Sequence, residues 1–586
     1  MTKKIWCGEK SLPDYPKNLA EMLNKNAEVF SDKPIYQEAH GGEYIPLLWR
    51  QFQKEVTAIQ NNLIKKGLRP GDRVAILSPN RKEMLELELA VMSMGAAAAP
   101  IFAGYPSITA DSLVNFCEPK FIVVADQNQY QKMKTPGNFQ LIIHFDPLEE
   151  IQANNTFSFE ELLSCSSEEK NITGNNVPSD SVCLMMYTSG TMGKPKCVQL
   201  THDNILSQQA AMRVLWKLSP DDRFLSYLPW HHSFGGIFEK YAAITNGAVL
   251  SLEHGFGKKI DILIDNWKKV KPTVFYSVPR IYQEIVTQIA QNPEIERLIF
   301  HDELRFIFTA AAPLPKNISD IFKKRGIPIY EGWGLTETSP CCTLTDPNVP
   351  RKPGEVGKPI AGVSLKLADD KEIMAQGPNV MKGYYKNPEE TEKVLTHDGW
   401  FYTGDVGEFT ETGLRLISRK DRIFKLNNAE KVVPSEIENL IVKDCPYLSH
   451  AFVAGSGRNY PVILLFPNKK MFTKITDESD AKVGCACPEG PHEFAYCLHH
   501  CLKKMNESIE VKYSRVKAAM LIDYELSIEN EELTPSMKLA PNIVAKVFKA
   551  NIDCLYGSGE SLSDKVYVIN LEDEFYHEDR EDHEKK

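Results

Sequence analysis

Short apolar runs that alternate with helical patterns are the feature that most restricts the fold of this chain. A strand that is apolar at nearly every residue has both faces buried, which is typical of parallel sheets covered by helices. The runs cover residues 72–77, 121–126, 182–188, 248–253, 273–279 and 305–312. The pattern therefore predicts an α/β fold whose sheets are largely parallel.

The length of the chain and a change in its character predict more than one domain. A chain of 586 residues exceeds what one hydrophobic core usually holds. Past residue 418, a charged connector leads into a helix that is predicted to begin after Pro434. We expect a large N-terminal α/β domain with subdivided sheets over residues 1–418, a small C-terminal α+β domain over 419–556 and a polar tail over 557–586.

Charge and hydropathy exclude two broad classes of function. The formal net charge of −10 leaves no basic field, so we expect no nucleic-acid partner. The longest apolar stretch, residues 89–105, is interrupted by Gly95 and Pro100 and predicts a buried helix and strand instead of a membrane span. The first residues lack the apolar core of a signal peptide, which predicts a cytoplasmic protein with reduced cysteines.

The segment YTSGTMGKPK, residues 187–196, collects hydroxyls, glycines and lysines directly after a predicted strand. Backbone N–H groups and hydroxyls at such a turn can bind a polyphosphate, although a plain turn has the same composition. A Walker loop is excluded, because too few residues separate Gly190 from Gly193 and Pro195 replaces the hydroxyl that binds Mg²⁺. A helix is expected to follow, with Asp203 as its N-cap.

Further motifs accompany this segment in a defined order along the chain. They are YEGWGLTE at residues 330–337, WFYTGD at 400–405, SRKDRIFK at 418–425 and ELTPSMK at 532–538. Together with the candidate phosphate loop, they resemble the adenylate-forming superfamily of acyl-CoA synthetases, luciferases and adenylation domains. The resemblance covers roughly residues 20 to 556, and the residues and spacing of the motifs are most similar to those of long-chain fatty acyl-CoA synthetases.

The resemblance implies a two-step reaction that uses ATP, Mg²⁺ and CoA. A fatty-acid carboxylate attacks the α-phosphate of ATP, pyrophosphate leaves, and the thiol of CoA then attacks the acyl-adenylate. Lys538 is implied to act in the adenylation step. The C-terminal domain is implied to be a mobile lid that rotates about a hinge near residues 418–422, at Lys420 or Asp421.

The same resemblance assigns residues to each part of the nucleotide. Glu337 is implied to bind Mg²⁺, and Thr336 to contact phosphate. Asp405, beside Arg419, is implied to accept hydrogen bonds from the ribose hydroxyls, although an isolated Gly-Asp pair is more often a solvated turn. The other implied contacts are the phosphate-binding residues Thr188, Ser189, Gly190, Thr191, Gly193, Lys194 and Lys196, and the adenine-binding residues Ala311, Trp333 and Gly334.

The segment LPWHHSFGGIFEKY, residues 228–241, resembles the family motif that carries a histidine near the acyl group. The match places His232 among the catalytic residues, and it places Trp230, Phe234 and Gly235 with His232 at the wall of an acyl pocket. A buried turn with a hydrogen-bonded histidine explains the pattern equally well. The resemblance favours a fatty acid over an amino acid, because no aspartate is found that would bind a substrate amino group.

Four positions depart from the family pattern and leave other functions open. Cys197 and Ser418 stand where glycine is usual, AAAPLP at residues 310–315 replaces GGAPL, and KLAPN lacks the usual basic residues after Lys538. The alternatives are an acyl-AMP ligase that loads a carrier protein, a luciferase-like oxygenase and a non-catalytic relative that binds nucleotide or acyl groups. Peripheral membrane contact also stays open, because long-chain fatty acids partition into membranes.

Two other segments carry weaker patterns. Residues 485–501 contain enough cysteines and histidines to bind Zn²⁺, but their spacing matches no common zinc site, and their second half predicts an amphipathic helix. The segment GSGESLSD, residues 557–564, resembles the phosphopantetheine site of carrier domains at Ser561, but no carrier-domain helix precedes it. We interpret the first segment as ordinary cysteines on a helix and the second as a linker.

Overall fold

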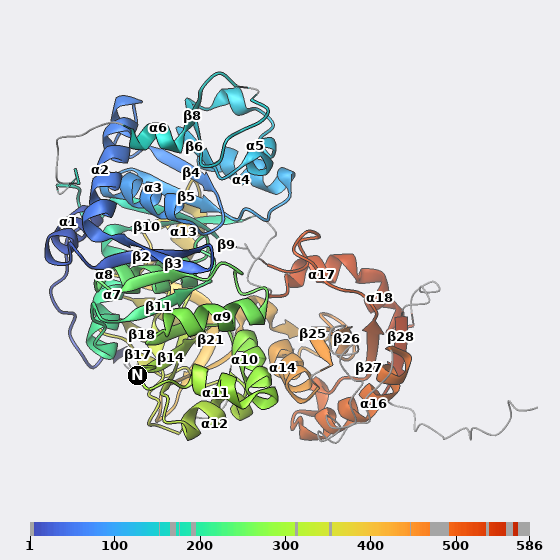
Figure 1. Ribbon diagram of the computed structural model, residues 1–586. Coiled ribbons are helices and arrows are strands. Elements are labelled where there is room, and N and C mark those ends of the chain that lie inside the picture. Colours follow the sequence, from blue (N-terminus) through green and yellow to red (C-terminus); the bar gives the residue numbers. More distant parts are fainter. Residues whose placement is uncertain are drawn as a thin grey trace, which may run out of the picture. The chain divides into compact units, whose positions relative to one another are not determined.

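Figure 1 shows the computed structural model of the chain. It describes residues 5–151, 153–164, 172–174, 176–188, 195–310, 314–350, 354–445, 447–468, 491–534, 538–557 and 566–571. The contacts divide the chain into two compact units. The first unit holds the described residues of Met1–Gly190, Lys194–Thr403 and Gly407–Leu416, and the second holds those of Gly404–Val406 and Ile417–Lys586.

The first unit contains an eight-stranded sheet in the order β20-β10-β9-β5-β4-β6-β7-β8. Its strands are β4 (Arg73–Leu77), β5 (Ala97–Ile101), β6 (Phe121–Val124), β7 (Leu141–His144), β8 (Thr156–Ser158), β9 (Val182–Thr188), β10 (Lys196–Thr201) and β20 (Gly383–Tyr384). Strands β4 to β9 pair in parallel, whereas β10 is antiparallel to both of its neighbours. In β4, Val74 and Ile76 face one core while Ala75 and Leu77 face another. Burial on both faces explains why this run is apolar throughout.

A nine-stranded sheet in the same unit has the order β17-β16-β15-β14-β13-β11-β12-β2-β3. Its strands are β2 (Pro34–His40), β3 (Glu43–Leu48), β11 (Arg223–Ser226), β12 (Val249–Leu252), β13 (Val274–Ser277), β14 (Phe306–Thr309), β15 (Ile329–Trp333), β16 (Thr343–Leu344) and β17 (Lys358–Pro359). The central strands are parallel, and β3, β16 and β17 pair antiparallel at the edges. The two sheets confirm the predicted α/β fold class.

Helices of the first unit pack on both sheets (Figure 1). Residues of α1, α2, α3, α7 and α8 share one hydrophobic core with strands of the two sheets. The helices are α1 (Leu19–Val29), α2 (Trp49–Lys65), α3 (Lys82–Ser93), α4 (Ser107–Cys117), α5 (Gln127–Gln131), α6 (Phe159–Leu163), α7 (His202–Trp216), α8 (Lys240–Thr245), α9 (Ile260–Val270), α10 (Pro279–Gln291), α11 (Pro293–Ile299), α12 (Lys316–Lys324) and α13 (Pro388–Val394). Shorter turns are the 3-10 helices η1 (Pro136–Asn138) and η3 (Thr336–Thr338) and the π-helix η2 (Phe234–Glu239).

Helix α7 begins one residue earlier than its predicted N-cap. The cap is Thr201, whose hydroxyl accepts a hydrogen bond from the Asn204 backbone N–H, while the Asn204 side chain accepts one from the Thr201 backbone. The prediction of Asp203 as the N-cap was therefore wrong. Asp203 lies in the first turn of α7 and accepts a hydrogen bond of 2.7 Å from the Tyr15 hydroxyl. A reciprocal capping box outcompetes the single acidic cap.

A five-stranded sheet and a short hairpin follow along the chain. The sheet order is β1-β18-β19-β21-β22, and the hairpin pairs β23 with β24. These strands are β1 (Trp6–Cys7), β18 (Ser364–Leu367), β19 (Glu372–Gln376), β21 (Phe401–Phe409), β22 (Leu414–Arg419), β23 (Phe424–Lys425) and β24 (Lys431–Val432), with the 3-10 helix η4 (Lys420–Arg422) between β22 and β23.

The second unit is built on a four-stranded sheet in the order β25-β26-β27-β28. Its strands are β25 (Leu448–Ala454), β26 (Val462–Pro467), β27 (Ala518–Ile522) and β28 (Val566–Asn570), and its helices are α14 (Pro434–Asp444), α16 (Pro491–Ser508), α17 (Pro541–Val547) and α18 (Lys549–Cys554), with the 3-10 helix η6 (Lys512–Ser514). Strand β28 lies inside the segment predicted to be a polar tail, 557–586, so that prediction missed a strand. Only Ile569 of this strand is fully buried, although its sequence, VYVIN, is mostly apolar.

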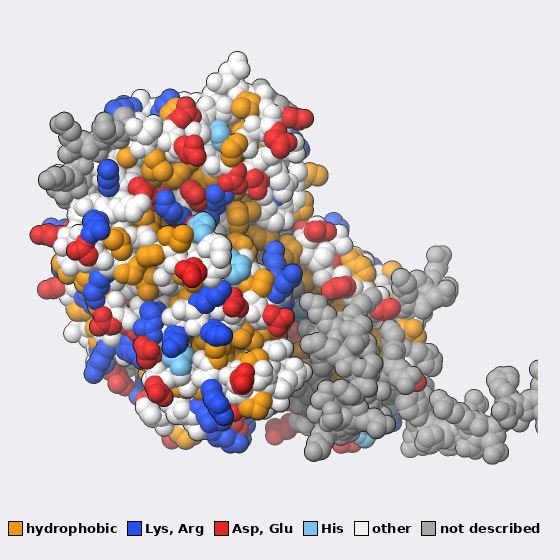
Figure 2. All heavy atoms as spheres, viewed as in Figure 1, with side chains coloured by type: hydrophobic (Ala, Val, Ile, Leu, Met, Phe, Trp, Pro, Cys, Tyr) orange, Lys and Arg blue, Asp and Glu red, His pale blue; other side chains and the backbone are white. Residues whose placement is uncertain are grey.

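Charged groups of both signs are spread over the surface of the first unit. Figure 2 shows lysine and arginine side chains interspersed with acidic ones over its visible face. Within the described part of the chain, no helix is long and apolar enough to cross a membrane.

Candidate functional site

The candidate phosphate loop joins two paired strands. Strand β9 ends at Thr188, β10 begins at Lys196, and these two residues are cross-strand partners. The predicted contacts between them, Ser189, Gly190, Thr191, Gly193 and Lys194, lie outside the described residues. Cys197, which stands where the family has glycine, is 1% exposed and packs in a hydrophobic core. A small thiol is therefore accommodated directly after the loop.

Lys196 is held by two side chains that follow it far along the chain. Its ammonium lies 2.9 Å from the Glu390 carboxylate and 4.9 Å from the centre of the Tyr384 ring. Hydrogen bonds from Lys393 and from Lys196 lower the pKa of Glu390 to about 2. The carboxylate is therefore charged at neutral pH and fixes Lys196 at the end of the loop.

Thr336 and Glu337 lie together on η3, just after β15. The hydroxyl oxygens of Thr336 and Ser233 are 3.1 Å apart, which connects this helix to the acyl motif. Glu337 is 8% exposed, and its Oε1 accepts a hydrogen bond of 2.8 Å from the Tyr384 hydroxyl. Tyr384 therefore contacts both Lys196 and Glu337, the residues assigned by resemblance to phosphate and to Mg²⁺.

Close backbone packing explains a glycine of the segment 330–337. A Cβ atom at Gly334 would lie 1.6 Å from the carbonyl oxygen of Pro340, so no other residue fits. Trp333 pairs with Thr343 across β15 and β16 and is 8% exposed. Gly334 is thus required because the backbone at Pro340 passes close to it. The adenine contacts of Trp333 and Gly334 stay predictions. Ala311 lies outside the described residues.

Asn80 fixes the segment that carries the acyl motif. It follows β4, is 5% exposed, donates a hydrogen bond to the Leu228 carbonyl at 2.8 Å and accepts one from the Trp230 N–H at 2.9 Å. Parallel sheets usually carry functional groups just beyond the carboxyl ends of their strands, where Asn80 lies. Trp230 itself is fully buried, with its ring 5.2 Å from the Lys240 ammonium. Trp230 therefore supports the motif from inside the core.

Two glycines allow the acyl motif to enter the π-helix η2. A Cβ atom at Gly235 would lie 2.6 Å from the Leu228 carbonyl oxygen, and one at Gly236 would lie 2.0 Å from that of Trp230. Backbone atoms therefore exclude any larger side chain at both positions. Phe234, at the start of η2, is 7% exposed. Single π-helical turns are frequent at functional sites, which agrees with the role predicted for this segment.

The two histidines of the acyl motif have different surroundings. His232 Nδ1 accepts a hydrogen bond of 3.3 Å from the Phe234 N–H. His231 lies against the Phe102 ring at 4.6 Å, and burial, with a further contribution from His232, lowers the pKa of His231 to about 3. His231 is therefore neutral at physiological pH, while His232 is oriented by the backbone of its own motif.

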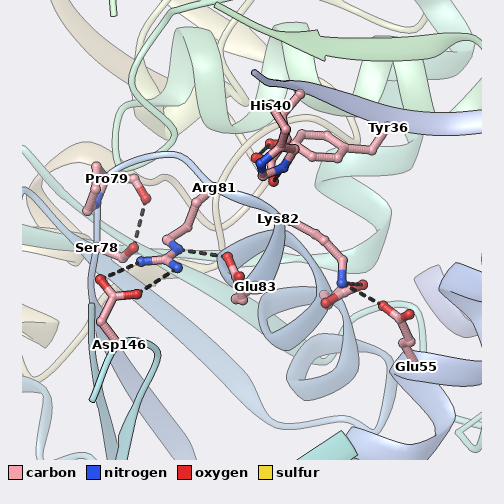
Figure 3. Close-up of polar contacts among 11 residues, drawn as sticks. Tyr36, His40, Glu55, Ser78, Pro79, Arg81, Lys82, Glu83 and Asp146 are labelled. Carbon is pink, nitrogen blue, oxygen red and sulfur yellow. Dashed lines mark hydrogen bonds and ion pairs between the residues drawn. The ribbon is translucent and has the colours of Figure 1, made fainter. Parts of the chain in front are cut away.

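Ion pairs anchor the loop between β4 and α3, directly after Asn80. Figure 3 shows the Arg81 guanidinium between two carboxylates, with Nε 2.7 Å from Glu83 and Nη2 3.0 Å from Asp146. The next residue, Lys82, pairs with Glu55 of α2 at 2.9 Å. These partly buried pairs hold the start of α3, and with it the position of Asn80.

In the second unit, Asp405 and Arg419 form an ion pair with a distance of 3.2 Å between Oδ1 and Nη1. Nε of Arg419 lies 3.7 Å from Oδ1 of Asp421. A Cβ atom at Gly404 would lie 2.8 Å from Nη2 of Arg419, at a backbone φ of +73° that favours glycine. Lys420 and Asp421 both lie on η4. The predicted ribose acid is thus connected to the predicted hinge through Arg419.

Lys538 closes a short loop of the second unit. The Thr534 N–H donates to the Lys538 carbonyl at 2.8 Å, and the Lys538 N–H donates to the Thr534 hydroxyl at 3.2 Å. Leu533 and Leu539 form an isolated β-bridge around this loop, and residues 535–537 lie outside the described residues. The backbone of Lys538 is therefore tied down, while burial of its ammonium lowers the pKa of Lys538 and the charge of Asp405 opposes that shift.

No cluster of three or more His, Cys, Asp or Glu side chains that could hold a metal ion occurs among the described residues. Residues 485–490 of the cysteine and histidine segment lie outside them, and its second half forms the predicted helix, α16. Ser561 also lies outside the described residues.

Asn80, Ser233, Tyr384 and Glu390 contact site residues without having been predicted. Asn80 carried a usable signal, because it is a polar residue just after an apolar run that ends a parallel strand. Ser233 lies inside the quoted acyl motif. Tyr384 and Glu390 belong to a segment whose sequence does not mark it as a site, and only their contacts with Lys196 and Glu337 reveal it.

Relatives with similar sequences include long-chain-fatty-acid–CoA ligase 5 of Rattus norvegicus, 28% identical over 93% of this chain and 89% of the rat protein. Fatty acyl-CoA synthetase A of Dictyostelium discoideum is 26% identical over 91% of this chain and 89% of that protein. Among solved structures, the ATP-bound RpMatB-BxBclM chimera B1 superposes with a TM-score of 0.73 at 23% identity, over 91% of this chain and 99% of the chimera.

A second structural neighbour is the o-succinylbenzoate CoA synthetase MenE from Bacillus subtilis, solved with its acyl-adenylate intermediate. It has a TM-score of 0.69 at 20% identity, over 89% of this chain and 97% of MenE. These likenesses show the fold. Residues 23–385 match the AMP-binding enzyme family, and residues 421–560 match the AMP-binding enzyme C-terminal domain. The chain therefore belongs to the family of AMP-binding enzymes.

Proposed function

We propose that the protein is an ATP-dependent acyl-CoA synthetase that converts a fatty acid, ATP and CoA into acyl-CoA, AMP and pyrophosphate. The observation that carries the proposal is the contact of Tyr384 with both Lys196 and Glu337, which gathers a cation and a carboxylate beside the candidate phosphate loop. Family membership supports it. Relatives named long-chain-fatty-acid–CoA ligases support a long-chain acid as the substrate.

In the first step, a carboxylate oxygen of the acid attacks the α-phosphorus of ATP, and pyrophosphate leaves. Negative charge grows on the leaving pyrophosphate as the P–O bond breaks, and Lys196 would stabilise it together with the amides and hydroxyls of the loop. In the second step, the sulfur of CoA attacks the acyl carbonyl, and AMP leaves. Neither step requires a covalent bond to the protein.

Glu337 fits the oxygen ligands that Mg²⁺ requires. Tyr384 occupies its Oε1, and Oε2 has no hydrogen-bond partner within the described part of the chain. Mg²⁺ commonly takes one or two protein carboxylates and fills its other positions with phosphate oxygens and water. When bound, the ion would neutralise charge on the ATP phosphates.

The aromatic side chains behind η2 support an apolar acyl group. The Phe234 and Phe238 rings lie 5.6 Å and 4.8 Å from the Phe308 ring, and the Tyr276 ring lies 5.2 Å from it. Burial of each methylene against such a surface contributes about 0.8 kcal/mol. These rings are themselves buried and pack on one another, so they form an apolar layer behind the motif, which is compatible with a fatty-acid substrate.

Product formation tests the proposal. The protein is incubated with ATP, Mg²⁺, CoA and a panel of C8 to C20 fatty acids, beside the variants Lys538→Ala and Lys546→Ala. Lys546 is an exposed lysine on α17 of the same unit and serves as the matched control. We expect acyl-CoA and AMP from the wild type and from Lys546→Ala. Lys538→Ala should lose roughly 100-fold in rate, because it lacks a cation aimed at the reacting phosphate.

The second half-reaction separates the role of Lys538 from a general defect. Supplied with preformed acyl-AMP and CoA, Lys538→Ala should form acyl-CoA at the wild-type rate. Fatty-acid-dependent pyrophosphate exchange without acyl-CoA would instead indicate an acyl-AMP ligase that loads a carrier protein. No exchange and no product with any acid would contradict the proposal and favour a non-catalytic relative.

A further inference from the structure

We propose that Tyr384 is a positioning residue that sets the places of two opposite charges in the ATP site, Glu337 through its hydroxyl and Lys196 through its ring. The inference rests on the proposed function, because it assigns a role within the same nucleotide site. Neither contact is apparent from the sequence, in which Tyr384 lies 47 residues from Glu337.

The Tyr384 ring has a fixed position because two elements hold its backbone. Tyr384 is the cross-strand partner of Val198 in the β10–β20 pair, and its N–H donates a hydrogen bond of 2.9 Å to the Thr391 hydroxyl of α13. A Cβ atom at the preceding Gly383 would lie 2.9 Å from Cγ2 of Thr391, so α13 packs closely against the strand. Tyr384 is 6% exposed. The backbone of Tyr384 is therefore fixed by β10 and α13, and burial of the side chain restricts its rotamers.

The hydroxyl of Tyr384 orients the Glu337 carboxylate. It donates to Oε1 at 2.8 Å in a buried setting, and the Met381 N–H donates to the Glu337 backbone carbonyl at the same distance. Backbone and side chain of Glu337 are thus both tied to the segment that ends at Tyr384. A hydrogen bond to one carboxylate oxygen leaves the other to face a ligand, as partners of metal ligands commonly do.

The ring of Tyr384 acts on Lys196 in a different way. The Lys196 ammonium lies 4.9 Å from the ring centre, within the range in which the ring attracts a cation. Glu390 holds the same ammonium from another side at 2.9 Å. Because the hydroxyl serves Glu337 and the ring serves Lys196, the two functions can be separated by substitution.

Calorimetric titration with ATP, in EDTA and in excess Mg²⁺ and without any fatty acid, tests the inference by binding alone. Tyr384→Phe keeps the ring and should bind ATP in EDTA like the wild type, but the gain in affinity that Mg²⁺ gives should shrink about tenfold. Tyr384→Leu removes ring and hydroxyl, so it should also bind ATP more weakly in EDTA. Tyr385→Phe is the matched control, because it also removes one tyrosine hydroxyl. The Tyr385 ring packs on Phe116, so this variant should leave both titrations unchanged.

The outcomes are distinguishable. A Tyr384→Phe variant with wild-type Tm and the full Mg²⁺ gain would overturn the inference while leaving the proposed function intact. Equal losses in EDTA and in Mg²⁺ for Tyr384→Phe would also overturn it, since they would indicate a general structural defect. Wild-type protein that binds no ATP in either buffer would overturn the proposed function, and this inference with it.

Discussion

The buried ion pair between Glu88 and Lys240 allows a quantitative test of what supports the acyl motif. Both side chains are 0% exposed, and Nζ of Lys240 lies 2.5 Å from Oε1 of Glu88. The Tyr241 hydroxyl donates to the same oxygen at 3.2 Å. Burial lowers the pKa of Lys240, and the charge of Glu88 opposes that shift. Since the ammonium also lies 5.2 Å from the Trp230 ring, the pair connects α3 to the C-terminal end of the motif, where α8 begins.

We expect Lys240→Met to lower the free energy of unfolding by about 3–5 kcal/mol, because it leaves the Glu88 carboxylate buried without a counter-charge. No described group takes over the other oxygen, since Oε2 of Glu88 has no hydrogen-bond partner among the described residues. Glu88→Leu should cost a similar amount, because it leaves a buried ammonium. The double variant removes both charges with side chains of similar volume and should recover most of the loss.

Thermal unfolding of the three variants measures this coupling. The first unit has roughly 400 residues, and an entropy of unfolding of about 2 cal/mol/K per residue gives about 0.8 kcal/mol/K for the unit. A loss of about 3–5 kcal/mol therefore corresponds to a fall in Tm of about 4–6 °C for each single variant. The double variant should lie within about 2 °C of the wild type.

An exposed lysine provides the control for the substitution itself. Lys546→Met on α17 should leave Tm unchanged, because it removes no buried charge. If the double variant loses as much as the sum of the two single variants, the two side chains are not coupled and the reasoning is refuted.

For two further perturbations, the structure determines whether the stability of the fold should rise or fall. Burial lowers the pKa of His202 to about 4, whereas an unfolded histidine titrates near 6.5. Protons therefore bind the unfolded chain more strongly, and stability should fall by about 2 kcal/mol between pH 7 and pH 5. In His202→Asn the curve of Tm against pH should be flatter, and an unchanged slope would contradict this assignment. A Cβ atom at Gly236 would lie 2.0 Å from the Trp230 carbonyl oxygen, so Gly236→Ala should lower Tm by several degrees. Gly137→Ala is the control and should match the wild type, because no atom lies within 4 Å of a Cβ at that position. Equal Tm values for the two variants would contradict the packing argument.

The apolar runs located strands well where burial on both faces made every residue apolar. All six predicted runs contain a strand: β4, β6, β9, β12, β13 and β14. Strand β10 was not predicted, since Lys196 and Gln199 interrupt its apolar pattern. Strand β28 has the apolar sequence VYVIN and was missed for another reason, because the whole region 557–586 was interpreted as a polar tail. Burial on both faces, which makes a strand apolar at nearly every residue, is therefore the feature that made strands recognisable in the sequence.

The residues of the site fall into two similar groups: those that a contiguous sequence motif reveals, and those that only contacts between distant segments reveal. Thr336, Glu337 and His232 belong to contiguous motifs, and the structure places Thr336 against Ser233 of the acyl motif. Asn80 lies 150 residues from Trp230, and no sequence pattern connects them. Such contacts depend on the order of strands within the sheets, which periodicity does not determine.

The hydrogen bonds of Asn80 also bear on the redesign of substrate preference. Replacement of the segment 228–241 by one whose backbone takes a different path past Asn80 would leave the buried Asn80 amide, and the N–H at position 230 and the carbonyl at position 228, without their partners. A graft of the acyl motif would therefore need the loop 78–81 to be transferred with it. A change of acyl specificity in this fold would therefore require two segments to be exchanged together. The shorter one, 78–81, lies outside the motif and supports it only through hydrogen bonds.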